Sequence, residues 1–177
     1  VVYTMPPASF VFDSLHAGQP LNLGEDLPRK DLDELQHELD ERLLTEAKVQ
    51  SIAQFCQRVR NATDRAVFFN GLQAGLDFHG GIATWSMLCV LDKDYVHAVH
   101  ERLTTHYISQ IEALLPAIQE SVDIIMVNAD DHGAQDRTFL PPALFRKLYV
   151  PYYQRINQAV HRIAPHFKPF FHSCSAI

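Results

Sequence analysis

The sequence has few cysteines, no long apolar run and no cluster of basic residues, and each shortage excludes a class of protein. Three cysteines, far apart in the chain, are too few for a disulfide framework, so we predict a reducing compartment, the cytoplasm. The most apolar windows are broken by His79, Asp92 or Asp123 before they reach the roughly 20 residues of a membrane helix, which predicts no membrane association. The 15 Lys and Arg residues are scattered and the net charge is -6, which argues against nucleic acid as a partner.

The apolar content is sufficient for one domain with its own core. The chain has 177 residues, of which 47% are hydrophobic, and this length is short for two domains. We therefore predict a single domain over residues 1–177. Prolines and glycines interrupt residues 1–30 too often for long helices, so this part is predicted to be loop with short extended pieces at 1–5 and 9–15.

Short apolar runs alternate with helical patterns along the rest of the chain. The runs at 64–71, 122–131 and 168–174 are predicted to be strands buried on both faces. Apolar residues at steps of three and four predict helices over 31–41, 43–61, 94–119 and from Pro142 to about Ile163. This order is typical of parallel strands joined by helical crossovers, in either an open doubly wound sheet or a (β/α)8 barrel. No G-x-G-x-x-G motif follows any of these strands, so the dinucleotide-binding form of the open sheet lacks its phosphate loop.

Polar side chains follow each predicted strand, at the edge where both architectures place their active sites. The candidates for substrate binding are Asn70, His79, Asn128 and Gln135. Asp130, Asp131 and His132 are the candidate catalytic residues, because two adjacent carboxylates and an imidazole in a partly desolvated pocket would shift one another's pKa values towards those of proton-transfer groups. The alternative is ordinary turn chemistry, since D-D-H-G is also a favourable turn sequence.

The last predicted strand carries His172 and Cys174, one residue apart, so both side chains would point to the same face. Imidazole and thiolate are good zinc ligands, and this pair could supply two of the three protein ligands of an open catalytic site. The alternative is a buried cysteine beside a hydrogen-bonded core histidine. Cys56 and Cys89 are poorly placed to be a third ligand.

The other histidines and a group of apolar residues have simpler interpretations. His97, His100 and His106 lie among charged residues of the long helix and are predicted to be solvated. The alternating Trp85, Met87 and Cys89 are predicted to be packing residues.

Three segments of the chain carry a family resemblance: VDIIMVNADDHGAQ at 122–135, LPPALFRKLYVPYYQRINQAVHRI at 140–163 and KPFFHSC at 168–174. Together they resemble the uroporphyrinogen decarboxylase superfamily, which includes the zinc-dependent corrinoid methyltransferases. The resemblance runs from about Phe68 to the end. It implies a (β/α)8 TIM barrel, of which this chain would be a partial, middle portion, with residues 1–60 as a variable N-terminal region and 61–177 as barrel core. Such a fragment would expose sheet edges and is expected to need a partner, for example in a homodimer.

The two branches of the superfamily imply different chemistry. In the methyltransferases, a strand ending in His-x-Cys binds zinc, usually with glycine next, where this chain has Ser175. That branch implies methyl transfer to a thiol from a corrinoid, with a corrinoid protein as a candidate partner, and it is the leading hypothesis. Cofactor-free decarboxylation of the tetrapyrrole uroporphyrinogen is the first alternative, and a non-catalytic barrel that binds a corrinoid or tetrapyrrole is the second.

Overall fold

The computed structural model describes residues 29–72, 75–76, 81–134, 136–173 and 175. The extended pieces predicted at 1–5 and 9–15 lie outside these residues. In chain order the elements are α1 (Leu32–Glu41), α2 (Glu46–Ala62), β1 (Phe68–Phe69), α3 (Ile82–Leu91), α4 (Lys93–Ile118), β2 (Ile124–Asn128), α5 (Pro142–Leu148), α6 (Val150–Ile163) and β3 (Lys168–Phe171). None of the described helices is both long enough and apolar enough to cross a membrane.

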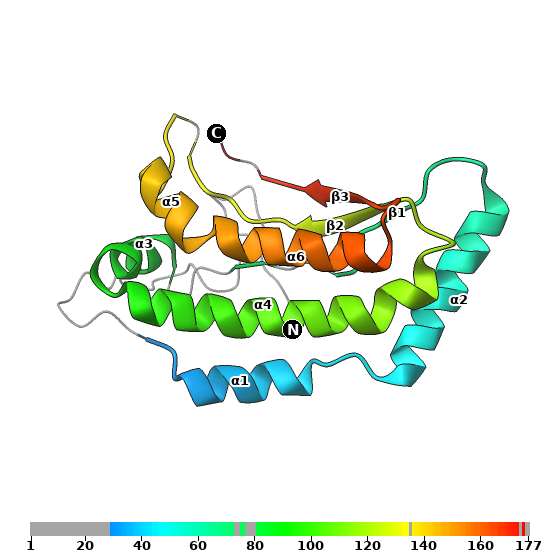
Figure 1. Cartoon of the computed structure of the whole chain (residues 1–177), viewed down its shortest axis with the longest axis horizontal. Helices are drawn as coiled ribbons and strands as arrows, with labels where there is room; N and C mark the ends of the chain where they lie inside the picture. Colours follow the sequence, from blue (N-terminus) through cyan, green and yellow to red (C-terminus); the bar gives the residue numbers. More distant parts are fainter. Residues whose placement is uncertain (1–28, 73–74, 77–80, 135, 174, 176–177) are drawn as a thin grey trace, which may run out of the picture.

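The strands form a parallel sheet in the order β1-β2-β3 (Figure 1). Neighbours in the sheet are therefore successive strands in the chain, and each pair is connected through helices, as the alternating pattern predicts. The long helices α4 and α6 lie on the same side of the sheet (Figure 1). This arrangement is that of successive βα units and is consistent with part of a TIM-barrel-like domain.

One face of the sheet packs into the main core. Val67, Ile125 and Val127 are buried there against apolar side chains of α2, α4 and α6. On β1 and β3, however, Phe68 and Phe170 are 45% and 44% exposed, and their rings meet edge to face at 5.5 Å. The prediction that these strands are buried on both faces is therefore wrong for the described residues, since the helices cover one face only.

Two histidines of the long helix α4 are less exposed than predicted. Its apolar stripe is buried as expected, but His100 and His106 are buried too. His100 Nδ1 lies 2.9 Å from the carbonyl oxygen of Leu148, and His106 Nε2 lies 2.8 Å from Nε2 of Gln110. The charged neighbours in the sequence are misleading because α1 and α6 cover opposite sides of α4 (Figure 1), and the imidazoles obtain polar partners inside the protein.

One prediction of a helix, and the packing role predicted for Met87, need correction. The single helix expected from Pro142 is divided at Tyr149, because Pro151 lies in the first turn of α6 and has no N–H with which to continue the hydrogen bonding of α5. Residues 82–91 are helical, so Trp85 and Cys89, four apart, are fully buried on one side while Met87 is 40% exposed.

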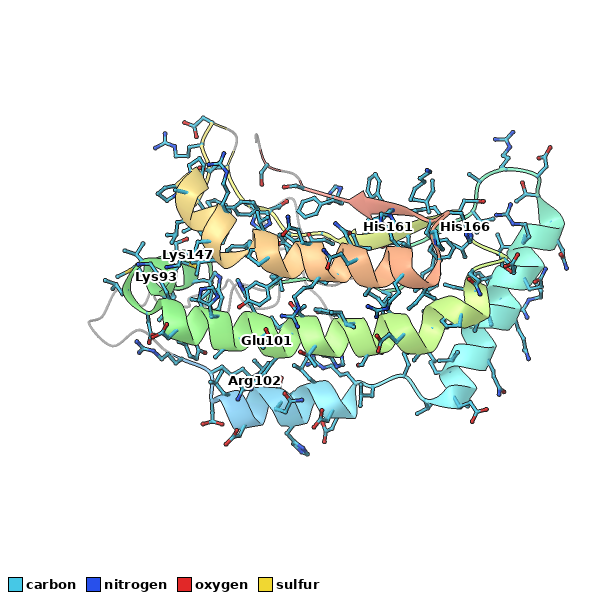
Figure 2. The ribbon with its side chains drawn as sticks, viewed as in Figure 1. Lys93, Glu101, Arg102, Lys147, His161 and His166 are labelled. Carbon is cyan, nitrogen blue, oxygen red and sulfur yellow. The ribbon has the colours of Figure 1, made fainter. Side chains whose placement is uncertain are left out.

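Ion pairs join α4 to α6 on the surface and stabilise the amino end of the sheet. Glu101 of α4 accepts hydrogen bonds from Arg155 of α6 at 2.6 and 2.8 Å, and it lies on the outer surface of the helix (Figure 2). At the amino end of β2, Asp123 accepts from the backbone N–H of Val67 at 2.7 Å and pairs with Arg60 of α2. These bonds hold the pKa of Asp123 below its usual range. The amino end of the sheet is thus a structural junction, and the candidate site lies at the other end.

Candidate functional site

The carboxyl ends of β2 and β3 are joined by backbone hydrogen bonds. The N–H of His172, just after β3, donates to the carbonyl oxygen of Asn128, the last residue of β2, at 3.0 Å. Further along, Oγ of Ser175 accepts from the backbone N–H groups of His132 and Gly133 at 2.8 and 2.9 Å. The segment that follows β3 therefore lies against the loop that follows β2, where the candidate catalytic residues occur.

Asp130 is the centre of a buried polar network. The residue is 7% exposed, and its Oδ2 accepts from the backbone N–H of Leu76 at 2.7 Å, from Nδ2 of Asn128 at 2.7 Å and from the hydroxyl of Tyr153 at 2.8 Å. Asn128 also accepts from the backbone N–H of Asp130 at 2.7 Å through its Oδ1. The Asn128 amide therefore fixes Asp130, and three separate parts of the chain meet at one carboxylate oxygen.

His132 lies next to this network and is surrounded by aromatic rings. Its Nε2 is 2.8 Å from the hydroxyl of Tyr153, and its ring centroid is 4.8 Å from that of Phe145 and 5.0 Å from that of Tyr149. The ring of Phe171 stacks on it at 6.0 Å. Burial lowers the pKa of His132 below its ordinary value, and this effect exceeds the opposing attraction of the nearby Asp130 and Asp131. The imidazole is therefore neutral at pH 7 and can accept a proton.

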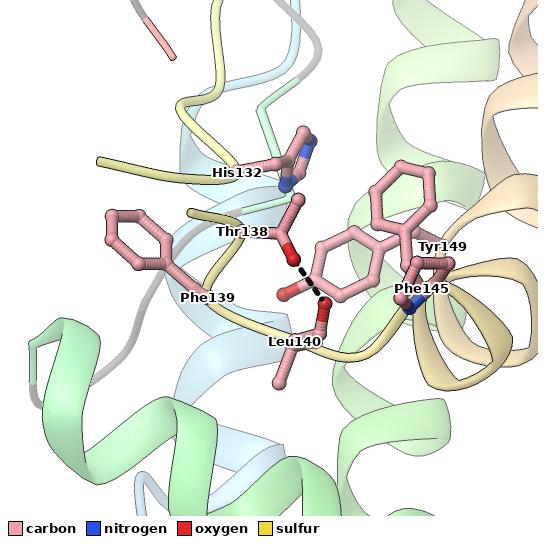
Figure 3. Close-up of a pocket in the computed structure, with 7 residues that line it drawn as sticks. His132, Thr138, Phe139, Leu140, Phe145 and Tyr149 are labelled. Carbon is pink, nitrogen blue, oxygen red and sulfur yellow. Dashed lines mark hydrogen bonds between the residues drawn. The ribbon is translucent and has the colours of Figure 1, made fainter. Parts of the chain in front are cut away.

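A small apolar cavity of about 150 Å³ opens beside His132 (Figure 3). Its lining residues are His132, Thr138, Phe139, Leu140, Pro142, Phe145 and Tyr149. The Thr138 hydroxyl donates to the carbonyl oxygen of Leu140 at 2.8 Å, so the wall offers few polar contacts (Figure 3). Tyr149, fully buried at the back, accepts a hydrogen bond from Nε1 of Trp85 at 2.7 Å. The cavity can hold a small apolar group next to an imidazole.

A tight turn shapes the loop that carries these residues. Ala134 N–H donates to the carbonyl oxygen of Arg137 at 2.8 Å, and Phe139 N–H donates to that of His132 at 2.9 Å. A Cβ atom on Gly133 would lie 2.6 Å from the Arg137 carbonyl oxygen, so this close approach requires glycine. The turn brings Thr138 and Phe139 back to His132. The D-D-H-G residues thus lie in a loop, and Asp130 and His132 of this loop lie close together.

The remaining candidates occupy different positions. Asn70 is exposed after the end of β1, and Asp131 is half-buried beside His132. His79, Gln135 and Cys174 lie outside the described residues.

His172 is exposed and follows β3, which ends at Phe171, so the prediction that it lies within the strand is wrong. Among the described residues, no group of three or more His, Cys, Asp or Glu is arranged to hold a metal. Cys56 and Cys89 are buried in α2 and α3, and burial raises the pKa of Cys89 to about 11, so neither is suited to act as a thiolate ligand.

Two residues of the site escaped prediction from the sequence. Tyr153 bridges Asp130 and His132 although it lies on α6, and Ser175 binds the loop after β2 although its position suggested only a departure from glycine. The spacing of four between Tyr149 and Tyr153 was a usable signal, because it places two phenols on one side of a helix.

The comparison with protein families gives one match. The family model described as uroporphyrinogen decarboxylase (URO-D) matches residues 28–177. The match includes α1 and α2 as well as the segment from Phe68 that carries the resemblance. No curated protein and no solved structure gives a significant match. Because the family model covers most of the sequence and includes the parallel strands with their polar carboxyl ends, the chain belongs to the uroporphyrinogen decarboxylase (URO-D) family.

Proposed function

We propose that this protein is an enzyme of the methyl-transfer branch of its superfamily, which moves a methyl group from a corrinoid to a thiol. In this proposal the described sheet is part of a (β/α)8 barrel, and a partner corrinoid protein delivers the methyl donor. The observation that carries the proposal is the contact between two segments. Of the residues on either side of Cys174, His172 is hydrogen-bonded to Asn128 at the end of β2, and Ser175 is hydrogen-bonded to the following loop at His132 and Gly133.

His172 and Cys174 would hold zinc. An imidazole and a thiolate suit this ion, and the His172 side chain is exposed at the carboxyl end of the sheet. Zinc, when bound, would lower the pKa of a substrate thiol and so favour its thiolate. Asp131, half-buried beside His132, would orient the substrate together with Asn70, His79 and Gln135.

His132 would receive the proton that the thiol gives up. It is neutral because burial lowers its pKa, and it is therefore able to act as a base near neutral pH. Asp130 stabilises the arrangement through Tyr153 and would oppose any movement of the ring.

The cavity supports methyl transfer over tetrapyrrole decarboxylation. Its volume of about 150 Å³ and its aromatic and aliphatic wall suit a methyl or methylthio group. Neither lysine nor arginine is among the described residues that line it, whereas a substrate with many carboxylates needs cations around it. Arg137, in the same loop, is exposed and hydrogen-bonded to Asp136 at 2.6 and 3.0 Å.

Metal analysis of the full-length protein tests the proposal. We expect the wild type to retain zinc after dialysis, and Cys174→Ala and His172→Ala to lose most of it. Cys56→Ala is the matched control, because it removes a thiol that is buried in α2, and it should retain zinc as the wild type does. Absence of zinc from the wild type, or equal zinc in Cys174→Ala, would refute the proposal.

Decarboxylation of uroporphyrinogen is the second candidate, and the description of the matching family favours it. In that case Asp130 and Asp131 would face the substrate and no metal would be needed. Formation of coproporphyrinogen from uroporphyrinogen by the full-length protein, undiminished in Cys174→Ala, would establish this reaction in place of methyl transfer.

A further inference from the structure

The hydroxyl of Tyr153 lies between Asp130 and His132. It is 2.8 Å from Oδ2 of Asp130 and 2.8 Å from Nε2 of His132. Tyr153 belongs to α6, so the helix that covers the sheet also supplies the link between two side chains of the loop after β2. Its burial raises the pKa of Tyr153 far above the ordinary value, so the phenol keeps its proton.

Counting protons gives the direction of each hydrogen bond. Oδ2 of Asp130 accepts from Leu76 N–H and from Asn128 Nδ2, and it receives the Tyr153 proton as a third donor. A phenol has a single proton, so the oxygen of Tyr153 can only accept from His132. Nε2 of His132 must therefore carry the hydrogen, and in the neutral ring Nδ1 is the nitrogen with the lone pair.

We propose that Tyr153 is a positioning residue that holds His132 as its Nε2–H tautomer and fixes the orientation of the ring, so that Nδ1 is the atom that accepts a proton from the substrate. The inference rests on the proposed role of His132 as a base. The neighbouring rings support it, because Phe145, Tyr149 and Phe171 restrict the imidazole on several sides while Tyr153 bonds to its Nε2.

A purely structural role for Tyr153 makes a different prediction. The ring of Tyr153 also packs against Phe171, with centroids 5.4 Å apart, and a phenylalanine would retain that contact. Tyr153→Phe removes only the oxygen, so it separates packing from tautomer control. Tyr152→Phe is the matched control, because the Tyr152 hydroxyl bonds to His97, a residue outside the network.

Nuclear magnetic resonance of the full-length protein, with ¹⁵N in the histidine rings, tests the proposal directly. Long-range ¹H–¹⁵N correlation spectra distinguish the two tautomers, and the His132 signals are assigned by their loss in His132→Gln. We expect the Nε2–H pattern in the wild type and in Tyr152→Phe. In Tyr153→Phe we expect the pattern to become that of Nδ1–H or of a mixture of tautomers.

An Nδ1–H pattern in the wild type overturns the proposal, as does an unchanged Nε2–H pattern in Tyr153→Phe. Should Tyr153→Phe fail to fold, the wild-type spectrum still decides, because an Nδ1–H tautomer cannot donate to Tyr153. In the turnover assay, kcat of Tyr153→Phe should fall by roughly 10- to 100-fold with little change in KM, as for residues that orient a reacting group. The tautomer test requires neither zinc nor substrate, so its failure is distinguishable from the failure of methyl transfer.

Discussion

Replacing Asp130 by alanine should destabilise the protein strongly, because three donors lose their acceptor together. The backbone N–H of Leu76, the amide of Asn128 and the hydroxyl of Tyr153 all point at one oxygen at 2.7 to 2.8 Å, in a site where Asp130 is 7% exposed. Each buried donor without a partner costs about 1–3 kcal/mol, and entry of water would recover part of this, so we expect a total loss of about 3–5 kcal/mol. That is a large share of the roughly 5–15 kcal/mol that stabilises an ordinary domain.

Urea denaturation monitored by tryptophan fluorescence measures this loss. Trp85 is the single tryptophan, and its indole is buried against Tyr149, so its emission should report unfolding. Asp130→Asn retains one acceptor oxygen and should lose less stability than Asp130→Ala. Asp136→Ala, an exposed carboxylate of the same loop, is the control and should leave the midpoint unchanged. A loss in Asp130→Ala below about 1 kcal/mol would contradict the reasoning, because it is less than the cost of one unpaired buried donor.

Three further predictions concern titration, thiol reactivity and the loop contact. Burial lowers the pKa of His132 and His106 in the folded protein, so the unfolded chain binds protons first as the pH falls below the ordinary pKa of 6.5. The free energy of unfolding should therefore be highest above that pH and should decrease below it. Urea midpoints that fail to decrease from about pH 8 to pH 5 would contradict this. With its pKa raised to about 11, Cys89 should react with iodoacetamide at about pH 8 roughly 100-fold more slowly in the native than in the unfolded protein. Peptide mass mapping separates the label on Cys89 from that on Cys56, and equal rates for Cys89 in the native and unfolded protein would contradict the prediction. Ser175→Ala removes the acceptor of two backbone N–H groups, so hydrogen exchange should accelerate in the peptide that contains residues 132–133, while peptides of α4 stay unchanged. The free energy of unfolding should fall by about 1 kcal/mol. Unchanged exchange at 132–133 would show that the contact is absent in solution.

The alternation of periods predicted the arrangement of the sheet correctly. Runs of apolar residues separated by helical repeats require parallel strands, and the carboxyl ends of such strands must lie at one edge. This is enough to bring Asn128, Asp130 and His132 near the segment that follows β3 without any knowledge of side-chain contacts. The burial of His100 and His106 could not be predicted in this way, because it depends on which helices pack over α4.

The link through Tyr153 could not be predicted from the sequence for a related reason. Tyr153 stands 23 residues after Asp130, next to the apolar stripe of α6, and its hydroxyl reaches the carboxylate only because the start of α6 lies near the carboxyl end of β2 (Figure 1). Interhelical and helix–sheet angles follow from side-chain packing over the whole interface, and a local pattern does not specify them. A phenol on a buried helix face predicts a polar partner, but it does not say which one.

The register of β2 and β3 changes just before His172. Met126 pairs with Phe170, but Asn128, two residues later, pairs with the very next residue, Phe171, so β2 contains one extra residue at this point. Such a bulge shifts the register by one, and a shift of one exchanges the two faces of the partner strand. Phe171 consequently stacks on His132, while His172 lies beyond the last pair and is held by its own N–H bond to Asn128. The position of this candidate ligand therefore depends on the contacts of the segment after β3 more than on the strand ladder, and of these contacts Ser175 supplies the two that reach the loop of Asp130 and His132. If His172 and Cys174 hold zinc as proposed, loss of the Ser175 hydroxyl should accordingly lower the zinc retained after dialysis even though serine is not a ligand, an effect that a strand-borne site would not show.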